Sequence, residues 1–136
     1  LEITESAFAK DTEQIVAIVK RLIDYGFTVE IDDFGSGYSS LSLLTALPCD
    51  TIKLDKSFLK HKPITEDDKM LLGCVISLAH KMGKCIICEG VETAEHIALM
   101  HELQCNIVQG YYYSRPLTLE ELKNHLTKEA NLSPVP

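Results

Sequence analysis

The sequence predicts an α/β fold built on a parallel sheet, and three observations lead to this prediction. Short apolar segments with strand character alternate five times with segments of helical spacing. Glycine or proline follows several of the helical segments, where helices commonly end. The chain has 136 residues, 46% hydrophobic and 24% charged, which is typical of one globular domain. Alternation of this kind indicates parallel strands joined by crossover helices.

Each expected element has its own signal. Strands are expected at residues 1–4, 27–33, 51–55, 84–88 and 107–113. The first helix is indicated by an apolar stripe at Ile15, Ile18, Val19, Leu22 and Ile23. A short helix is expected at residues 38–46. The third helix should begin after an N-terminal cap at Thr65. Its buried face should consist of Leu71, Val75, Leu78, Ala79 and Met82. The last two should run over residues 93–103 and from a capping box at 118–121.

The sheet could be open and doubly wound, or it could be part of a barrel. No glycine-rich dinucleotide-binding pattern follows the first strand, and no P-loop pattern is present, which favours the barrel. A complete (β/α)8 barrel of the TIM type needs about 250 residues, so we expect an incomplete barrel of about five βα units. The chain begins without Met inside a strand, which indicates a fragment. We expect residues 1–130 to be the C-terminal portion of a domain and residues 131–136 to be a tail.

Charge and cysteine content exclude several classes of function. The net charge is −7 and no basic stripe is present, which argues against polymeric nucleic acid and anionic membrane surfaces as partners. No apolar run is long enough to span a membrane, and no signal peptide is expected. The five cysteines form no disulfide or zinc pattern, so reduced thiols and a cytoplasmic location are expected. The chain could also be the cytoplasmic part of a membrane-anchored parent.

Acidic side chains gather at the ends of the expected strands. Asp32 and Asp33 end the second strand, Asp55 the third and Glu89 the fourth, while Glu2 lies on the first. The carboxyl ends of parallel strands are where such folds build their sites. A buried parallel strand without a site is nearly continuous in apolar residues. Solvated strand-end charges are the alternative interpretation.

Carboxylates that lie close together at one end of a sheet either take up protons or bind cations. Oxygen ligands favour Mg²⁺ or Mn²⁺ over zinc, and the adjacent Asp32 and Asp33 suit a ligand that bridges two metals. Two such ions activate water for phosphoryl displacement. Lys53 could hold a phosphate or position the attacking water, or it could form a salt bridge to Asp55 or Glu89. Glu92 could be a ligand, a guanine contact or a helix N-terminal acid.

The sequence resembles the EAL-domain family of cyclic di-GMP phosphodiesterases. Five segments carry the resemblance in the family's order, namely residues 1–6, 32–41, 50–58, 89–93 and 109–117. The resemblance implies a (β/α)8-type barrel that hydrolyses cyclic di-GMP to linear pGpG with Mg²⁺ or Mn²⁺. Ser36, Cys88 and Tyr113 stand where the family more often has Thr, Ala and Phe.

The resemblance also implies a role for each matching residue. Glu2 and Asp32 match ligands of the first metal ion. Asp32 also matches the ligand that bridges the two metal ions, and Asp33 matches a ligand of the second. Glu89 and Lys53 match the pair that holds and activates the water. The remaining matches are supporting or substrate-side groups. They are Glu5, which anchors the glycine loop in the family, and Asp55, Glu92 and Gln109.

The segment that gives the family its name, Glu-Ala-Leu, and a following asparagine ligand have no counterpart in the chain. We therefore expect the fragment to be inactive alone, the chemistry to belong to a parent with upstream sensory or signalling domains, and a homo-oligomer to cover the open strand edges. A degenerate domain that acts as a cyclic di-GMP receptor or regulatory module is the alternative. An unrelated metal enzyme acting on another phosphate ester is a third reading.

Overall fold

The computed structural model describes residues 1–9, 11–37, 41–46, 48–61 and 63–130. Five parallel strands lie side by side in chain order. They are β1 (Glu2–Thr4), β2 (Glu30–Phe34), β3 (Thr51–Leu54), β4 (Cys85–Glu89) and β5 (Ile107–Gln109). The α/β class expected from the alternating pattern is confirmed.

In the described part of the chain, five α-helices and two short 3₁₀ helices connect and follow the strands. The α-helices are α1 (Thr12–Asp24), α2 (Leu41–Ala46), α3 (Glu66–Lys81), α4 (Ala94–Glu102) and α5 (Leu119–Ala130). The 3₁₀ helices are η1 (Glu5–Ala9) and η2 (Lys56–Leu59). Residues 38–40 of the expected second helix and the expected tail at 131–136 lie outside the described residues.

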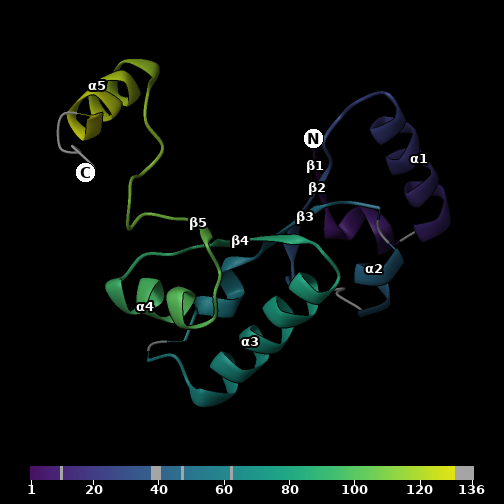
Figure 1. Ribbon diagram of the computed structural model, residues 1–136, viewed down its shortest axis with the longest axis horizontal. Helices are drawn as coiled ribbons and strands as arrows, with labels where there is room; N and C mark the ends of the chain where they lie inside the picture. Colours follow the sequence, from purple (N-terminus) through teal and green to yellow (C-terminus); the bar gives the residue numbers. More distant parts are fainter. Residues whose placement is uncertain (10, 38–40, 47, 62, 131–136) are drawn as a thin grey trace.

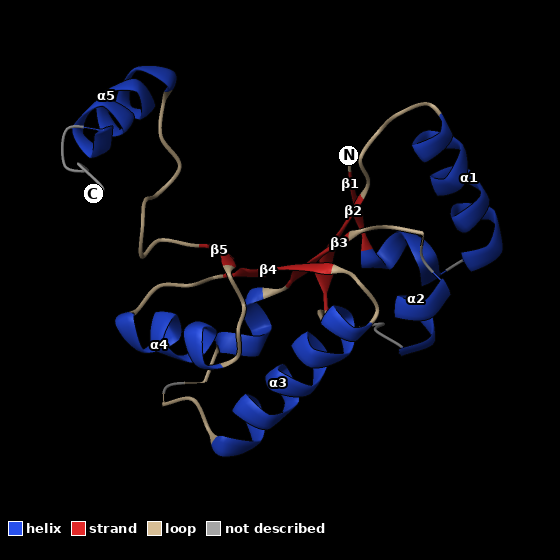
Figure 2. Cartoon of the chain, viewed as in Figure 1, coloured by secondary structure: helices blue, strands red, loops and turns tan. Residues whose placement is uncertain are grey.

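The sheet has the form of part of a barrel. Figures 1 and 2 show α2, α3 and α4 on the same side of the sheet, whereas a doubly wound sheet carries helices on both faces. The strands are joined in simple sequence, with no reversal of strand order. In Figure 1, α5 stands apart from the sheet at the end of a long connection after β5. Within the described residues, no helix is of a length and apolarity that would carry it across a membrane.

The core lies between the strands and the helices that cover them. Ile31, Ile52 and Cys88 are fully buried on three neighbouring strands. They belong to the same cluster as Ile76 of α3 and Leu99 of α4. The residues that alternate with them along the strands face the other side of the sheet, where the acidic side chains lie.

The apolar stripe predicted for α3 is correct at Ala79 and wrong at Leu71. Leu71 is 57% exposed, while Leu72, Ile76 and Ala79 are buried. Val75, Leu78 and Met82 pack only partly against the core. The helix carries two adjacent apolar rows, and helical spacing alone does not show which of them faces the sheet. In α1 likewise, Ile18 and Ile23 are exposed and Val19 is buried.

The fifth strand is shorter than predicted and ends at Gln109. Residues 111–113 form a turn, in which the Tyr112 amide donates to the Val91 carbonyl at 3.0 Å. The turn begins at Gly110, where an added Cβ would lie 2.1 Å from the Val91 carbonyl oxygen. The close approach to the loop before α4 therefore diverts the chain from the sheet, and only glycine permits it.

Candidate metal site

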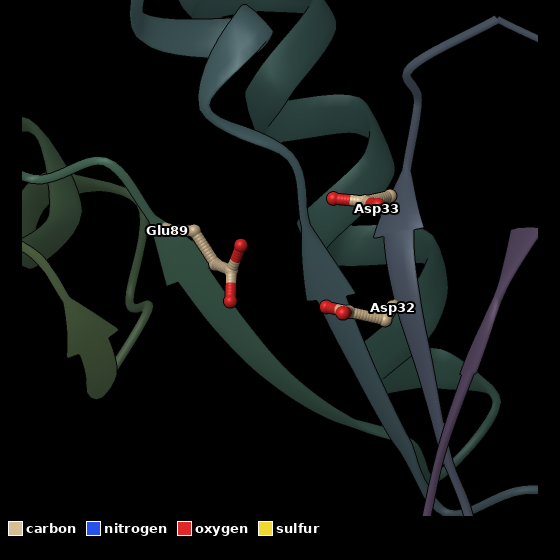
Figure 3. A group of neighbouring side chains, drawn as sticks. All are labelled: Asp32, Asp33 and Glu89. Carbon is tan, nitrogen blue, oxygen red and sulfur yellow. The ribbon is translucent and has the colours of Figure 1, made fainter.

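A β-bulge at the end of β2 places Asp32 and Asp33 on one side of the sheet. Pairing with β3 shifts register between Ile31 and Phe34, and Asp33 has a φ of 56°. Consecutive residues of a regular strand point to opposite faces, so the two carboxylates would otherwise diverge. Figure 3 shows both carboxylates directed toward Glu89 at the end of β4. Left-handed backbone at a non-glycine residue is costly and tends to occur at functional sites.

Asp32, Asp33 and Glu89 form the acidic cluster of the site. Each offers one carboxylate oxygen, and the three oxygens lie within 4.8 Å of one another. All three side chains are half-buried. Three carboxylate oxygens at such separations, without sulfur or imidazole, suit a hard divalent cation such as Mg²⁺ or Mn²⁺. Glu2 was predicted as a fourth ligand but lies outside this cluster, and its side chain is 55% exposed.

Lys53 joins three of the predicted acids. Its ammonium lies 2.9 Å from Glu2 Oε1, 2.9 Å from Asp32 Oδ1 and 2.8 Å from Glu89 Oε1. Burial of this side chain by itself would lower the lysine pKa. The hydrogen bonds to Glu89, Asp32 and Glu2 outweigh burial and raise the pKa well above its ordinary value, so Lys53 is charged.

The salt bridge considered for Lys53 is present to Glu89 and not to Asp55. Asp55 instead caps η2, because its Oδ1 accepts a hydrogen bond from the Ser57 amide at 2.9 Å. The carboxylate therefore supports the loop beside the cluster, and the Asp55 amide ties this loop to β2 by donating to the Phe34 carbonyl at 3.0 Å.

Glu5 anchors the glycine loop that follows the aspartates. Its Oε2 accepts a hydrogen bond from the Gly35 amide at 2.8 Å, and Glu5 is only 1% exposed. Gly35 has a φ of 100°, and a Cβ added there would lie 2.2 Å from the Phe58 ring. The backbone angle and this close approach both require glycine. At Gly37, the second glycine of the loop, no atom of the described residues lies within 4 Å of an added Cβ.

Glu92 and Gln109 lie beside the cluster rather than in it. With Glu89 they line a cavity of about 190 Å³ over the ends of β4 and β5. Lys56 and Tyr111 also line this cavity, and no role was predicted for either residue. The available signals were the position of Lys56 just after the third predicted strand and that of Tyr111 near the end of the fifth. The Arg115 guanidinium lies 4.7 Å from the centre of the Tyr111 ring.

Fold and site together define a class of protein. The chain is a parallel (β/α) barrel segment with a carboxylate site for divalent cations at the carboxyl ends of its strands. The model of the EAL domain family matches residues 1–116, so the chain belongs to the EAL domain family.

Relatives and solved structures agree with this assignment. The chain is 40% identical over 126 residues to the cyclic di-GMP phosphodiesterase NbdA of Pseudomonas aeruginosa, covering 93% of this chain and 16% of that protein. The crystal structure of the EAL domain of Mycobacterium smegmatis DcpA matches with a TM-score of 0.84 and 39% identity, covering 94% of this chain and 57% of that one. The chain thus spans about a sixth of NbdA and rather more than half of the DcpA structure.

A third match bears on the metal. A manganese and cyclic di-GMP complex of Klebsiella pneumoniae BlrP1 matches with a TM-score of 0.78 and 33% identity, covering 85% of this chain and 29% of that one. Its manganese is consistent with the hard-cation preference of the acidic cluster here.

Proposed function

We propose that this chain is the C-terminal portion, over residues 1–130, of a domain that hydrolyses cyclic di-GMP to linear pGpG. The observation that carries the proposal is the convergence of Asp32, Asp33 and Glu89, each of which offers one oxygen within 4.8 Å of the others. The Lys53 ammonium contacts two of these acids, Asp32 and Glu89. Two Mg²⁺ or Mn²⁺ ions bound here would supply an activated water and neutralise the charge that develops on the phosphodiester.

We assign a separate role in this reaction to each residue at the site. We assign Asp32 as the ligand that bridges two cations, because its carboxylate lies beside those of Asp33 and Glu89. Glu89 accepts from Lys53 at 2.8 Å, so this pair can orient a water and take its proton. We assign Glu2 to the first cation, although its side chain here is directed to Lys53.

Four further residues support the site. Glu5 holds Gly35 and thereby the loop after the aspartates, and Asp55 holds the loop after β3. Glu92 and Gln109 line the cavity next to Glu89, where they can contact the nucleotide. These assignments follow the matching motifs together with the positions of the side chains.

The chain alone should be inactive and should associate with itself. Among the strands that the structure describes, β1 and β5 each pair with one neighbour, so both edges of this sheet are open. The α5 residues Leu119, Leu122 and Leu126 are exposed along one helix face. Open edges and apolar faces of this kind favour pairing with another chain or with the rest of a barrel. We place the parent in the cytoplasm or on the cytoplasmic side of a membrane, attached to sensory or signalling domains.

Hydrolysis of cyclic di-GMP by the full-length parent, assayed with Mn²⁺ or Mg²⁺, tests the proposal. Asp32→Asn and Glu89→Gln should each reduce turnover by at least about a hundredfold. Asp24→Asn, at the exposed end of α1, is the matched control and should leave turnover unchanged. Unchanged turnover in both site variants would contradict the assignment. Binding without hydrolysis by the native parent would instead support the receptor alternative.

A further inference from the structure

The 3₁₀ helix η2 contacts the loop that follows Asp33. Its Phe58 ring lies so close to Gly35, two residues after Asp33, that a Cβ added at Gly35 would overlap the ring. Phe58 is half-buried and also packs against the hydrophobic core, which holds the ring in place. Gly35 is thus held on two sides, by this ring and by its hydrogen bond to Glu5. The loop that begins at Asp33 therefore rests on η2.

The same helix contacts the loop that follows Glu89. Lys56, the first residue of η2, lies against Gly90, and a Cβ added at Gly90 would be 2.4 Å from the Lys56 Cβ. Gly90 has a φ of 72°, which glycine adopts without strain. The Asp55 carboxylate caps η2 and fixes its start. The helix therefore lies between two loops, each of which follows an acid of the cluster.

Strand pairing alone does not fix the backbone of Asp33. The register between β2 and β3 shifts between Ile31 and Phe34, so Asp33 is not one of the paired positions of the described sheet. A φ of 56° at a non-glycine residue persists only where the surroundings impose it. The Ser36 amide donates to the Asp33 carbonyl at 3.1 Å and closes a turn around Gly35, the residue against which η2 packs. The conformation of Asp33 therefore depends on what holds this turn.

We propose that η2 is a brace that sets the separation of Asp33 and Glu89, with Phe58 as a positioning residue that holds Asp33 in the cation site. The proposal rests on the proposed function, since it takes the acidic cluster as the cation site of the phosphodiesterase. Without the ring, Gly35 is free to change its backbone angles and Asp33 to leave the left-handed conformation. The Asp33 carboxylate then no longer points toward Glu89 as it does in Figure 3.

Mn²⁺ binding to the 136-residue chain, measured by calorimetry, tests the proposal. Phe58→Ala should weaken Mn²⁺ binding about tenfold, which is typical of residues that orient a metal ligand. Leu78→Ala truncates another half-buried side chain that packs against the core, on α3, and is the matched control. The control should keep the Mn²⁺ affinity within about twofold. Unchanged affinity in Phe58→Ala, or an equal loss in Leu78→Ala, would overturn the positioning role.

A double-mutant cycle separates positioning from general destabilisation. Asp33→Asn removes the charge that Phe58 is proposed to position. Adding Phe58→Ala to Asp33→Asn should therefore weaken Mn²⁺ binding further by less than about twofold. If the ring supported the site only by stabilising the fold, the losses of the two single variants would add. Additive losses would therefore overturn the proposal.

The native chain provides a second measurement, which decides the question if Phe58→Ala does not fold. Nuclear Overhauser effects should connect the Phe58 ring to the α protons of Gly35, and Mg²⁺ should shift the resonances of both residues. Asp33→Asn should abolish this response at the same Mg²⁺ concentration. Phe58 resonances that Mg²⁺ does not move, or a native chain that binds neither Mg²⁺ nor Mn²⁺, would overturn the brace.

None of these readouts needs turnover, so the two proposals can fail separately. A parent that binds Mn²⁺ but does not hydrolyse cyclic di-GMP would contradict the proposed function and leave the role of η2 intact. Hydrolysis by the parent, together with an Mn²⁺ affinity that Phe58→Ala does not change, would contradict only the role of Phe58.

Discussion

The Lys53 ammonium lies 2.8 Å from the Glu89 carboxylate, at the centre of the acids that end the strands. The same ammonium contacts Asp32 at 2.9 Å, and its side chain is only 7% exposed. A buried cation thus offsets the repulsion between acids that converge on one point. We therefore expect stability and metal binding at this site to be coupled through this lysine.

Lys53→Met should destabilise the chain and make its stability depend on divalent cations. Loss of the charged hydrogen bonds should lower the free energy of unfolding by about 1.5–3 kcal/mol, because half-buried carboxylates lose their counter-charge. Mn²⁺ should restore more stability to the variant than it adds to the native chain. Urea unfolding with and without Mn²⁺ measures both effects. Lys20→Met, on the exposed face of α1, is the control, and an equal response in the two variants would contradict the coupling.

Asp33→Asn should weaken Mn²⁺ binding without disturbing the bulge. Asparagine tolerates the same left-handed conformation as aspartate, so the change removes only the charge at a φ of 56°. We expect the affinity to fall on the order of tenfold or more, as measured by calorimetry or Mn²⁺ spin resonance. Asp24→Asn serves as the control. Unaltered Mn²⁺ affinity in Asp33→Asn would show that Asp33 is not a ligand of the cation.

Substitution by alanine should have different effects on stability at the two glycines of the loop after β2. Gly35→Ala must adopt a φ of 100° and would bring its Cβ within 2.2 Å of the Phe58 ring. We expect a loss of at least about 2 kcal/mol in unfolding free energy. In Gly37→Ala the new Cβ has no atom of the described part of the chain within 4 Å, so the unfolding free energy should change by less than about 0.5 kcal/mol. Similar losses in both variants, measured by urea unfolding, would mean that the loop is not held as described.

The cap of α3 should be sensitive to acid. The hydrogen bonds from Thr65 and His61 lower the pKa of Asp68 from 3.8 to about 2. Because the folded-state pKa is the lower one, protonation favours the unfolded chain. The contribution of the ionised Asp68 to the stability of the folded chain is complete above about pH 4 and is lost as the pH falls toward 2. Asp68→Asn should remove this part of the pH dependence of the thermal midpoint, whereas Asp67→Asn in the same turn should keep it. Identical pH profiles for the two variants would contradict this origin.

Thiol reactivity should follow burial. Cys74 is exposed on α3, while Cys88 on β4 is buried and burial raises its pKa to about 12. Burial also raises the pKa of Cys49 and of Cys105. A thiol reagent at pH 8 should therefore modify Cys74 first, and Cys88 only on unfolding. Cys74→Ser should abolish the fast phase, and a fast phase that persists in this variant would show that the half-buried Cys85 or a buried thiol reacts as fast.

The sequence determined the parts of the molecule that depend on local chemistry. The capping box at Thr65 was predicted and is present, and Thr118 and Glu121 make the reciprocal contacts expected before α5. The strand pattern placed Glu89 at the end of its strand, where the structure has it, whereas β2 continues two residues beyond Asp32 to Phe34. Such features depend on residues a few positions apart, so spacing reveals them.

Other features were decided only by tertiary structure. The sequence shows that Asp32 and Asp33 are adjacent, and a regular strand would have sent them to opposite faces. The bulge that brings them together depends on pairing with β3, and the partners of Lys53 depend on how three strands lie side by side. The row of α3 that is buried depends in the same way on the sheet beneath it. Residue spacing along one segment specifies which side chains share a face of that segment, whereas contacts between segments depend on their register and packing.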